Sequence, residues 1–296
     1  MFMYKTSKAC YTQNYAGNNA ITCNIIDFQK SHDELKIILP NECQKHIFKN
    51  LVFTLIDNLS IEQFKKIIFN SNFNIIIDNK DYSLPLSFYI ELGKIEKFEN
   101  KIIVTFPDNF LELFTIHSKI LCKIDNCIFG NYFDKISLIE NVIFYKHIKK
   151  KSLFSSNYVF FTQKISYYNL LLDLKDNTCF EKEFYIKKHI KGFFIQCDNY
   201  NKLYNLEFNV NYDQLILYDK LLLHLYSYRV SNNLFYISFS KNNDYRDINK
   251  KSYENSLNTH KIEFFKIVLN FENKPSYLNI YFLFSEFIHL KDGIYS

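Results

Sequence analysis

Cysteine, histidine and carboxylate side chains carry most of the chemistry that this chain could perform, and a few of them stand at suggestive spacings. Cys43 and His46 form a C-x-x-H pair, and Cys122 and Cys127 are separated by four residues. A structural zinc ion needs four ligands, so each pair supplies only half of a site. Because buried thiols are also common in apolar cores, we interpret these residues as structural and predict no metal site.

Asp108, Glu112 and His117 form a second cluster, directly after the apolar run at residues 101–106. Carboxylates and a histidine at this spacing could hold the metal ion of a nuclease. Carboxylates in a loop that follows a strand are nevertheless routine on protein surfaces. We therefore expect this cluster to be solvated and assign it no catalytic role.

The common catalytic motifs are absent from the sequence. The five glycines stand too far apart to form a phosphate-binding loop. The chain also has no G-x-S-x-G elbow, no H-E-x-x-H helix and no paired C-x-x-C knuckle. The sequence therefore predicts a protein that is not an enzyme, with no catalytic, cofactor-binding or metal-binding residue and no cofactor.

The chain is mildly basic, with a net charge of +5 and a pI of about 8.6. Its longest basic run, residues 147–151, is short and typical of a solvated loop, so we expect no specific binding of nucleic acid. Aromatic residues make up 18% of the chain. They could stack on bases, but packing in cores and interfaces is the use that we favour.

Cysteine usage and hydropathy indicate the compartment. The seven cysteines are an odd number spread through a long chain, and the N-terminus has no signal-peptide pattern. We therefore expect reduced thiols in a cytoplasmic compartment. No apolar run approaches the roughly 20 residues that a spanning helix needs, so we do not expect the chain to insert into a membrane.

The first half of the chain carries strand patterns with two interruptions. Ser60 and Gln63 have the spacing of a capping box, which predicts a short helix or a strand entry. The segment after Pro85 stops at Gly93 and predicts a small helix between strands. The predicted strands of this half are residues 34–39, 47–56, 73–77, 101–106, 116–124 and 136–147.

The second half also consists of strand patterns separated by polar segments. Strands at intervals of roughly 10 to 15 residues are typical of an antiparallel sandwich. A polar segment at residues 149–157 is the best candidate linker. It divides the chain into an arm at residues 1–20, a first domain at 21–150 and a second domain at 151–296, both mostly β. The predicted strands of the second half are residues 158–164, 170–174, 183–186, 189–197, 203–210, 221–226, 234–240, 261–270 and 277–288.

The final strand pattern, at residues 277–288, is the clearest of all. Leu278, Ile280, Phe282 and Phe284 share one face, and residues such as Asn279, Tyr281 and Ser285 share the other. A period of two with one apolar face predicts a strand that buries only that face.

The last part of the chain carries a series of short motifs: Ser238-Phe239-Ser240, Ser256-Leu257-Asn258, Ile280-Tyr281 and Gly293-Ile294-Tyr295-Ser296. With these motifs the chain resembles the major capsid proteins of double jelly-roll DNA viruses, the lineage of nucleocytoplasmic large DNA viruses, virophages and Polinton-like viruses. Two upstream strands, residues 189–195 and 206–211, also look like strands of that family. The likeness is concentrated in about the last 110 residues.

The resemblance implies an all-β fold of two consecutive eight-stranded antiparallel jelly-roll sandwiches with short inserted helices. It also implies a major capsid subunit that forms homotrimers, whose pseudo-hexagonal outline tiles an icosahedral shell. Expected partners are further copies of the chain, minor capsid proteins or an internal membrane, which the N-terminal arm would reach. The expected location is the virion, with assembly in the host cytoplasm or nucleus.

Some features depart from the family pattern. Ile190 stands where a proline is usual, the Asn-Gly pair of one loop is missing, and the chain is shorter than most members. Two other functions therefore remain open. One is an assembly scaffold or minor capsid protein of the same fold; the other is a β-sandwich that binds or cleaves carbohydrate, which would need a cleft lined by two carboxylates.

Overall fold

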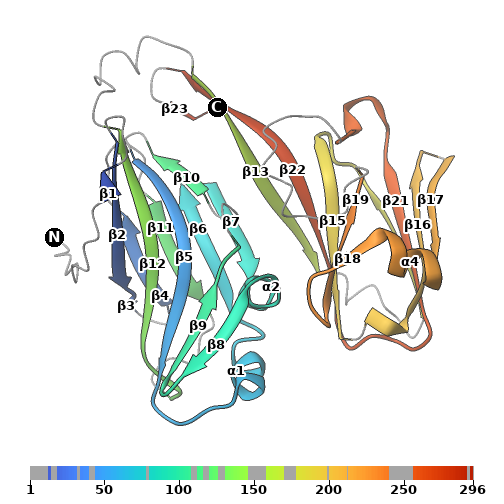
Figure 1. Ribbon diagram of the computed structural model, residues 1–296. Helices are drawn as coiled ribbons and strands as arrows, with labels where there is room; N and C mark the ends of the chain where they lie inside the picture. Colours follow the sequence, from blue (N-terminus) through green and yellow to red (C-terminus); the bar gives the residue numbers. More distant parts are fainter. Residues whose placement is uncertain are drawn as a thin grey trace. The chain divides into compact units, whose positions relative to one another are not determined.

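The computed structural model is built almost entirely from antiparallel strands (Figure 1). The chain divides into a first unit, Met1–Tyr158 with His289–Ser296, and a second unit, Val159–Ile288. The predicted linker at 149–157 lies outside the described residues, so the predicted domain boundaries stay a prediction. The structure describes residues 13–14, 19–31, 34–39, 44–77, 80–107, 112–115, 120–125, 131–145, 158–169, 178–198, 200–211, 213–239, 256–291 and 294–295.

Two sheets make up the first unit. The larger sheet has the order β1-β2-β12-β5-β9-β8, with β10 beside β5, and the smaller sheet has the order β3-β4-β11-β6-β7. The strands are β1 (Gln13–Asn14), β2 (Asn19–Asp27), β3 (Gln29–Ser31), β4 (Glu34–Leu39), β5 (Gln44–Leu55), β6 (Asn72–Ile77), β7 (Lys80–Pro85), β8 (Lys94–Phe98), β9 (Lys101–Thr105), β10 (Glu112–Thr115), β11 (Ile120–Asp125) and β12 (Phe133–Tyr145).

The second unit also has two sheets, whose strands include Tyr158, His289–Lys291 and Ile294–Tyr295 although these residues group with the first unit by contacts. One has the order β13-β22-β15-β19-β18, with β20 beside β15 and β23 beside β22, and the other has the order β14-β21-β16-β17. The strands are β13 (Tyr158–Asn169), β14 (Cys179–Phe184), β15 (His189–Cys197), β16 (Leu203–Val210), β17 (Asp213–Asp219), β18 (Ser227–Arg229), β19 (Leu234–Ser238), β20 (Leu257–Asn258), β21 (Phe265–Phe271), β22 (Leu278–Lys291) and β23 (Ile294–Tyr295).

The two units have the same strand order. The path β2-β12-β5-β9 corresponds to β13-β22-β15-β19, and the path β4-β11-β6-β7 corresponds to β14-β21-β16-β17. One short addition also agrees, because β10 pairs with β5 as β20 pairs with β15. Eight strands in two four-stranded antiparallel paths with this order are a jelly roll. The predicted fold of two consecutive jelly-roll sandwiches is therefore confirmed.

Aromatic side chains fill the space between the sheets. In the first unit Phe53, Phe64 and Phe133 meet with ring centroids 4.9 to 5.9 Å apart. In the second unit Phe282 contacts Phe184 and Phe265 with ring centroids 4.9 and 5.3 Å away. Burial of a phenylalanine side chain stabilises a fold by about 1.5–3 kcal/mol, so these clusters are the main source of cohesion within each unit.

Two short helices interrupt the first unit; the first is one of the two alternatives predicted at Ser60, and the second was predicted as a helix. Helix α1 (Ile61–Ile67) begins with the capping box, in which the Gln63 amide donates to Ser60 Oγ at 3.1 Å and the Ser60 amide donates to Gln63 Oε1 at 2.8 Å. Helix α2 (Leu86–Leu92) follows Pro85 and ends at Gly93. A Cβ atom at Gly93 would lie 2.5 Å from the Thr105 carbonyl oxygen, so only glycine permits this close approach to β9.

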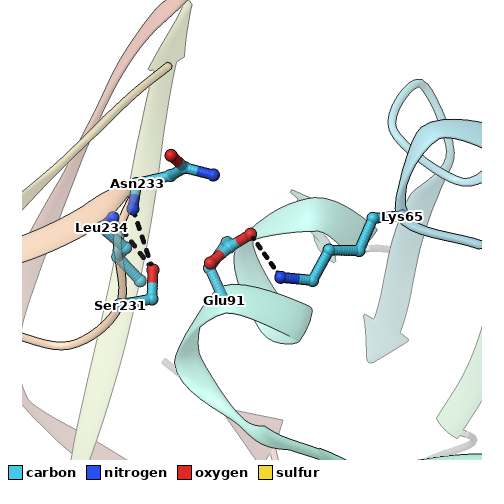
Figure 2. Close-up of polar contacts among 5 residues, drawn as sticks. All are labelled: Lys65, Glu91, Ser231, Asn233 and Leu234. Atoms are coloured by element: carbon cyan, nitrogen blue, oxygen red, sulfur yellow. Dashed lines mark hydrogen bonds and ion pairs between the residues drawn. The ribbon is translucent and has the colours of Figure 1, made fainter. Parts of the chain in front are cut away.

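One polar contact links the two helices, and two hydrogen bonds stabilise a turn of the second unit (Figure 2). Lys65 Nζ of α1 lies 3.3 Å from Glu91 Oε1 of α2. In the second unit, Ser231 Oγ accepts hydrogen bonds from the amides of Asn233 and Leu234 at 3.2 and 3.1 Å. A hydroxyl that binds amides two and three residues ahead stabilises a turn, and here that turn starts β19.

Among the described residues one predicted strand is wrong, and the strand predicted at residues 170–174 lies outside them. Residues 221–226 form the helix α4 (Lys220–Tyr226), and the strand before it, β17, was not predicted. The Asp219 side chain accepts a hydrogen bond from the Leu222 amide at 2.8 Å and caps the helix. Leucine also has a high helix propensity, so a capped run of leucines favours the helix over a strand.

The prediction for the last strand is only half right. Leu278, Ile280, Phe282 and Phe284 enter the core cluster of the second unit. Asn279 and Tyr281, on the opposite face of β22, are buried as well. Strand β22 therefore buries both faces over this stretch, whereas its alternation predicted one buried face.

Candidate functional site

The structure describes only part of the predicted candidate residues. Cys43, Asp108, His117 and Cys127 and the basic run at residues 147–151 lie outside the described residues. Glu112 belongs to β10, which pairs with β5. His46 and Cys122 are both buried, in β5 and β11 respectively.

His46 has a buried carboxylate partner that the sequence did not reveal. Its Nδ1 lies 2.8 Å from Glu140 Oε2, and neither side chain is exposed to solvent. Asn24 Nδ2 donates to the other carboxylate oxygen at 3.3 Å. Because a carboxylate only accepts, it favours the tautomer in which Nδ1 of His46 carries the proton. Glu140 shares its face of β12 with Leu138 and Val142, so the pair lies within the apolar interior.

A histidine oriented by a carboxylate is the general base of many hydrolases, but such a base must reach substrate. His46 Nε2, the nitrogen that would take the proton, is buried and has no hydrogen-bond partner among the described residues. The neighbouring Cys122 is no nucleophile, because burial and the Glu140 charge raise the pKa of its thiol. We therefore interpret His46, Glu140 and Cys122 as buried structural residues and assign them no catalytic role.

The second unit contains an uncharged group of buried polar side chains that corresponds to the His46–Glu140 pair of the first. Gln196 Oε1 accepts a hydrogen bond from Tyr281 Oη at 2.6 Å and from Asn279 Nδ2 at 3.1 Å. Gln196 lies between Ile195 and Cys197, which both enter the core cluster, so the amide is on the opposite face of β15. These three side chains tie β15 to β22 and contain no group that titrates near neutral pH.

One hollow of the first unit carries two carboxylates. Its lining includes Asp57, Asn58, Lys97 and Glu99, and Lys97 Nζ donates to Asn58 Oδ1. Glu99 occupies the turn between β8 and β9 with a φ of 48°, in the left-handed region. Most of the lining residues are exposed, so the hollow is open to solvent.

Five large exposed apolar side chains lie on two consecutive elements of the second unit. We call this group the α4 surface; it consists of Leu215 and Leu217 on β17 and Leu221, Leu225 and Tyr226 on α4. Contiguous apolar patches mark sites of association, whereas single exposed apolar side chains are normal on protein surfaces. The residue pattern did not reveal this surface, because residues 221–226 were predicted to be a strand.

The described part of the chain lacks two features that would indicate a metal site or a membrane span. No three of its His, Cys, Asp and Glu side chains are placed so that they could hold a metal ion. None of its helices is both long enough and apolar enough to span a membrane.

Comparison with known proteins supports the fold but gives little sequence similarity. No family model matches the chain, and no curated protein matches it. A crystal structure of PBCV-1 VP54, fitted into a cryo-EM reconstruction of the virophage Sputnik, matches with a TM-score of 0.65 at 10% identity, over 98% of each chain. The major capsid protein P2 of bacteriophage PM2 matches with a TM-score of 0.53 at 11% identity, over 90% of this chain and 97% of the other. Both units therefore share their fold with solved structures along nearly the whole chain.

Proposed function

We propose that this chain is a structural virion protein, the major subunit of an icosahedral capsid. The observation that carries the proposal is the match of both jelly rolls, over nearly the entire chain, to the fold of a major capsid protein. The residue motifs at the end of the chain, read from the sequence alone, point to the same role.

The duplicated topology explains how one chain could tile a shell. Each chain provides two building blocks with the same strand order. Three chains then provide six similar blocks, and a ring of six blocks has the pseudo-hexagonal outline that packs on a lattice. This proposal includes the homotrimer and its contacts with minor capsid proteins or an internal membrane. It also includes the arm at residues 1–20 as the segment that reaches these partners.

The role needs no chemistry from any side chain. The histidine–glutamate pair is sealed from solvent, and the network around Gln196 is neutral and buried. Association of large subunits draws its free energy from apolar and aromatic contact area. We therefore propose a protein without enzymatic activity, located in the virion after assembly in the host cytoplasm or nucleus.

Sedimentation velocity at micromolar concentration tests the proposal. A capsid subunit of this type should sediment as a trimer, whereas a strictly monomeric species across the concentration range would contradict it. Quantitative mass spectrometry of purified particles then separates the roles that share the fold. A major subunit should be among the most abundant proteins of the particle, whereas a few copies would identify a minor component and none would identify a scaffold.

The hollow beside Asp57 favours one second candidate, a carbohydrate-binding or carbohydrate-acting sandwich. Paired carboxylates are the groups that such sites use, and Glu99 supplies the second one. Among the described residues, the lining of the hollow includes no aromatic ring on which a sugar could stack. A glycan array decides the matter: binding that is lost in Asp57→Asn and Glu99→Gln variants would replace the capsid proposal by this one.

A further inference from the structure

Two histidines of the second unit lie close together at the start of β15. His189 is the first residue of β15, and His260 belongs to a short 3₁₀-helix, η4 (Thr259–Lys261), which directly follows β20. Their ring centroids are 5.6 Å apart, and their planes are inclined by 54°. His189 is partly buried and His260 is exposed, so the pair can exchange protons with the solvent.

The pair belongs to the contact that holds β20 and η4 on β15, which we call the η4 junction. In the register of β20 on β15, Asn258 lies opposite His189. The next residue, Thr259, is fully buried; its amide donates to the Lys188 carbonyl oxygen at 2.9 Å, and its hydroxyl accepts from the Lys188 amide at 2.8 Å. Ser256 Oγ lies 3.4 Å from His189 Nδ1. Few and local contacts therefore determine whether the junction is closed.

Most ionisable residues around the pair are basic. Lys188 Nζ lies 5.0 Å from the centre of the Phe284 ring, which is an uncharged group. Strand β20 contains no ionisable residue, and β22 places Ser285 opposite His189. The ionisable residues that adjoin the pair in the sequence or adjoin Ser285 are Lys187, Lys188, Lys191, Lys261, Glu263 and Glu286. Since four of these six are lysines, further positive charge is disfavoured here.

Protonation of both imidazoles is unfavourable in the closed junction. Burial lowers the pKa of His189 from its ordinary value of 6.5, and the neighbouring His260 lowers this pKa further. Two positive charges at the separation of these rings repel each other enough to change an equilibrium about threefold in water. An open junction, in which the rings separate, therefore binds protons more readily than the closed one. Opening becomes more favourable as the pH falls through about 6.5.

We propose that the η4 junction is an acid-sensitive contact, in which protonation of His189 and His260 releases β20 and η4 from β15. The release is local, because residues 192–196 of β15 pair with β19 and β22 independently of the two histidines. The second unit thus responds to an acidic environment at one defined place. This response does not depend on the proposed capsid function.

Hydrogen exchange at low salt, at about pH 7.5 and about pH 5, tests the inference on either side of the titration range of histidine. The amides of Lys188 and Thr259 report on the junction, because each donates a hydrogen bond across it. After correction for intrinsic exchange rates, their opening equilibrium should rise at least about threefold at the lower pH. Salt at about 1 M should reduce this rise, because it screens charge repulsion.

Two variants show whether the histidine pair causes the rise. A His189→Gln, His260→Gln variant removes both imidazoles and should open equally at the two pH values. His224→Gln is the matched control, since it replaces an exposed histidine of α4 in the same unit and should behave like the unaltered chain. Circular dichroism checks that each variant is folded.

Three results would overturn the inference. The first is an opening equilibrium of the unaltered chain that is the same at both pH values, a readout that does not depend on any variant. The second is a rise that persists when both histidines are replaced, and the third is a rise that is lost in His224→Gln as well. None of these results concerns assembly, so the capsid proposal would stand or fall separately on its sedimentation test.

Discussion

The first unit buries a histidine and a glutamate in its apolar interior, whereas the second unit buries a glutamine, an asparagine and a tyrosine on the face of a sheet turned away from its core cluster. Both groups join the two central strands of the larger sheet, β5 with β12 and β15 with β22. The same topology thus accepts an ionisable pair in one copy and a neutral network in the other. Breaking an ionisable pair is more costly than breaking one neutral hydrogen bond, so the two units should respond differently to polar substitutions.

The largest effect is expected from Glu140→Ala. The change leaves His46 buried without its carboxylate, and the loss of one partner of a buried pair costs about 3–5 kcal/mol. The free energy of unfolding, measured with urea, should fall by this amount for the transition of the first unit. A His46→Leu, Glu140→Met double variant should recover much of the loss, because apolar replacement removes both buried polar groups. A double variant that is less stable than Glu140→Ala would contradict this explanation.

A similar loss, about 3–5 kcal/mol, is expected when a core aromatic ring is removed from the second unit. Phe282→Ala deletes the ring that contacts Tyr168, Phe184, Phe193 and Phe265. The unfolding transition of the second unit should move to lower urea concentration while that of the first unit stays in place. Tyr185→Ala provides the control, since this exposed ring lies outside the core cluster and its removal should change stability by less than about 0.5 kcal/mol.

A smaller effect is expected from Tyr281→Phe. The change deletes one hydrogen bond to Gln196, whose amide oxygen keeps its bond from Asn279. A neutral hydrogen bond contributes about 0.5–1.5 kcal/mol, so the loss should be well below that of Glu140→Ala. If both variants lost the same free energy, the contrast between the ionisable and the neutral group would be refuted.

The smallest effects belong to the helix caps. Ser60→Ala and Asp219→Ala each remove one capping side chain, which typically costs about 1 kcal/mol or less at an exposed helix end. Thermal unfolding should show similar small shifts for the two variants, each in its own unit. Ser60→Asp, which retains a capping oxygen, should shift the transition less than Ser60→Ala.

Local signals in the sequence were sufficient to predict most of the strands and helices named above. Strands β15 and β16 match the predicted ranges 189–197 and 203–210, and the capping box at Ser60 marks the start of α1. Each of these elements depends on residues close together in the chain, where the period of apolar residues and the capping residues decide the conformation. Helix α4 differs from the predicted strand because its leucine-rich run, in which His224 is the one polar residue after Lys220, carries no clear period, and because the cap at Asp219 lies outside that run.

The polar clusters could not have been predicted in the same way. His46 and Glu140 are 94 residues apart, and Gln196 and Tyr281 are 85 residues apart. Only the pairing of β5 with β12 and of β15 with β22 brings them together, and that register follows from the whole fold. The second buried face of β22 was missed for a related reason, since Asn279 and Tyr281 look like solvent-facing residues until their hydrogen-bond partner is known.

The order of the strands also bears on how the protein is made. Every strand of the first unit's two sheets lies within residues 13–145, before all strands of the second unit's sheets. Domains usually fold in order as they leave the ribosome. The first jelly roll can therefore form while the second is still being synthesised.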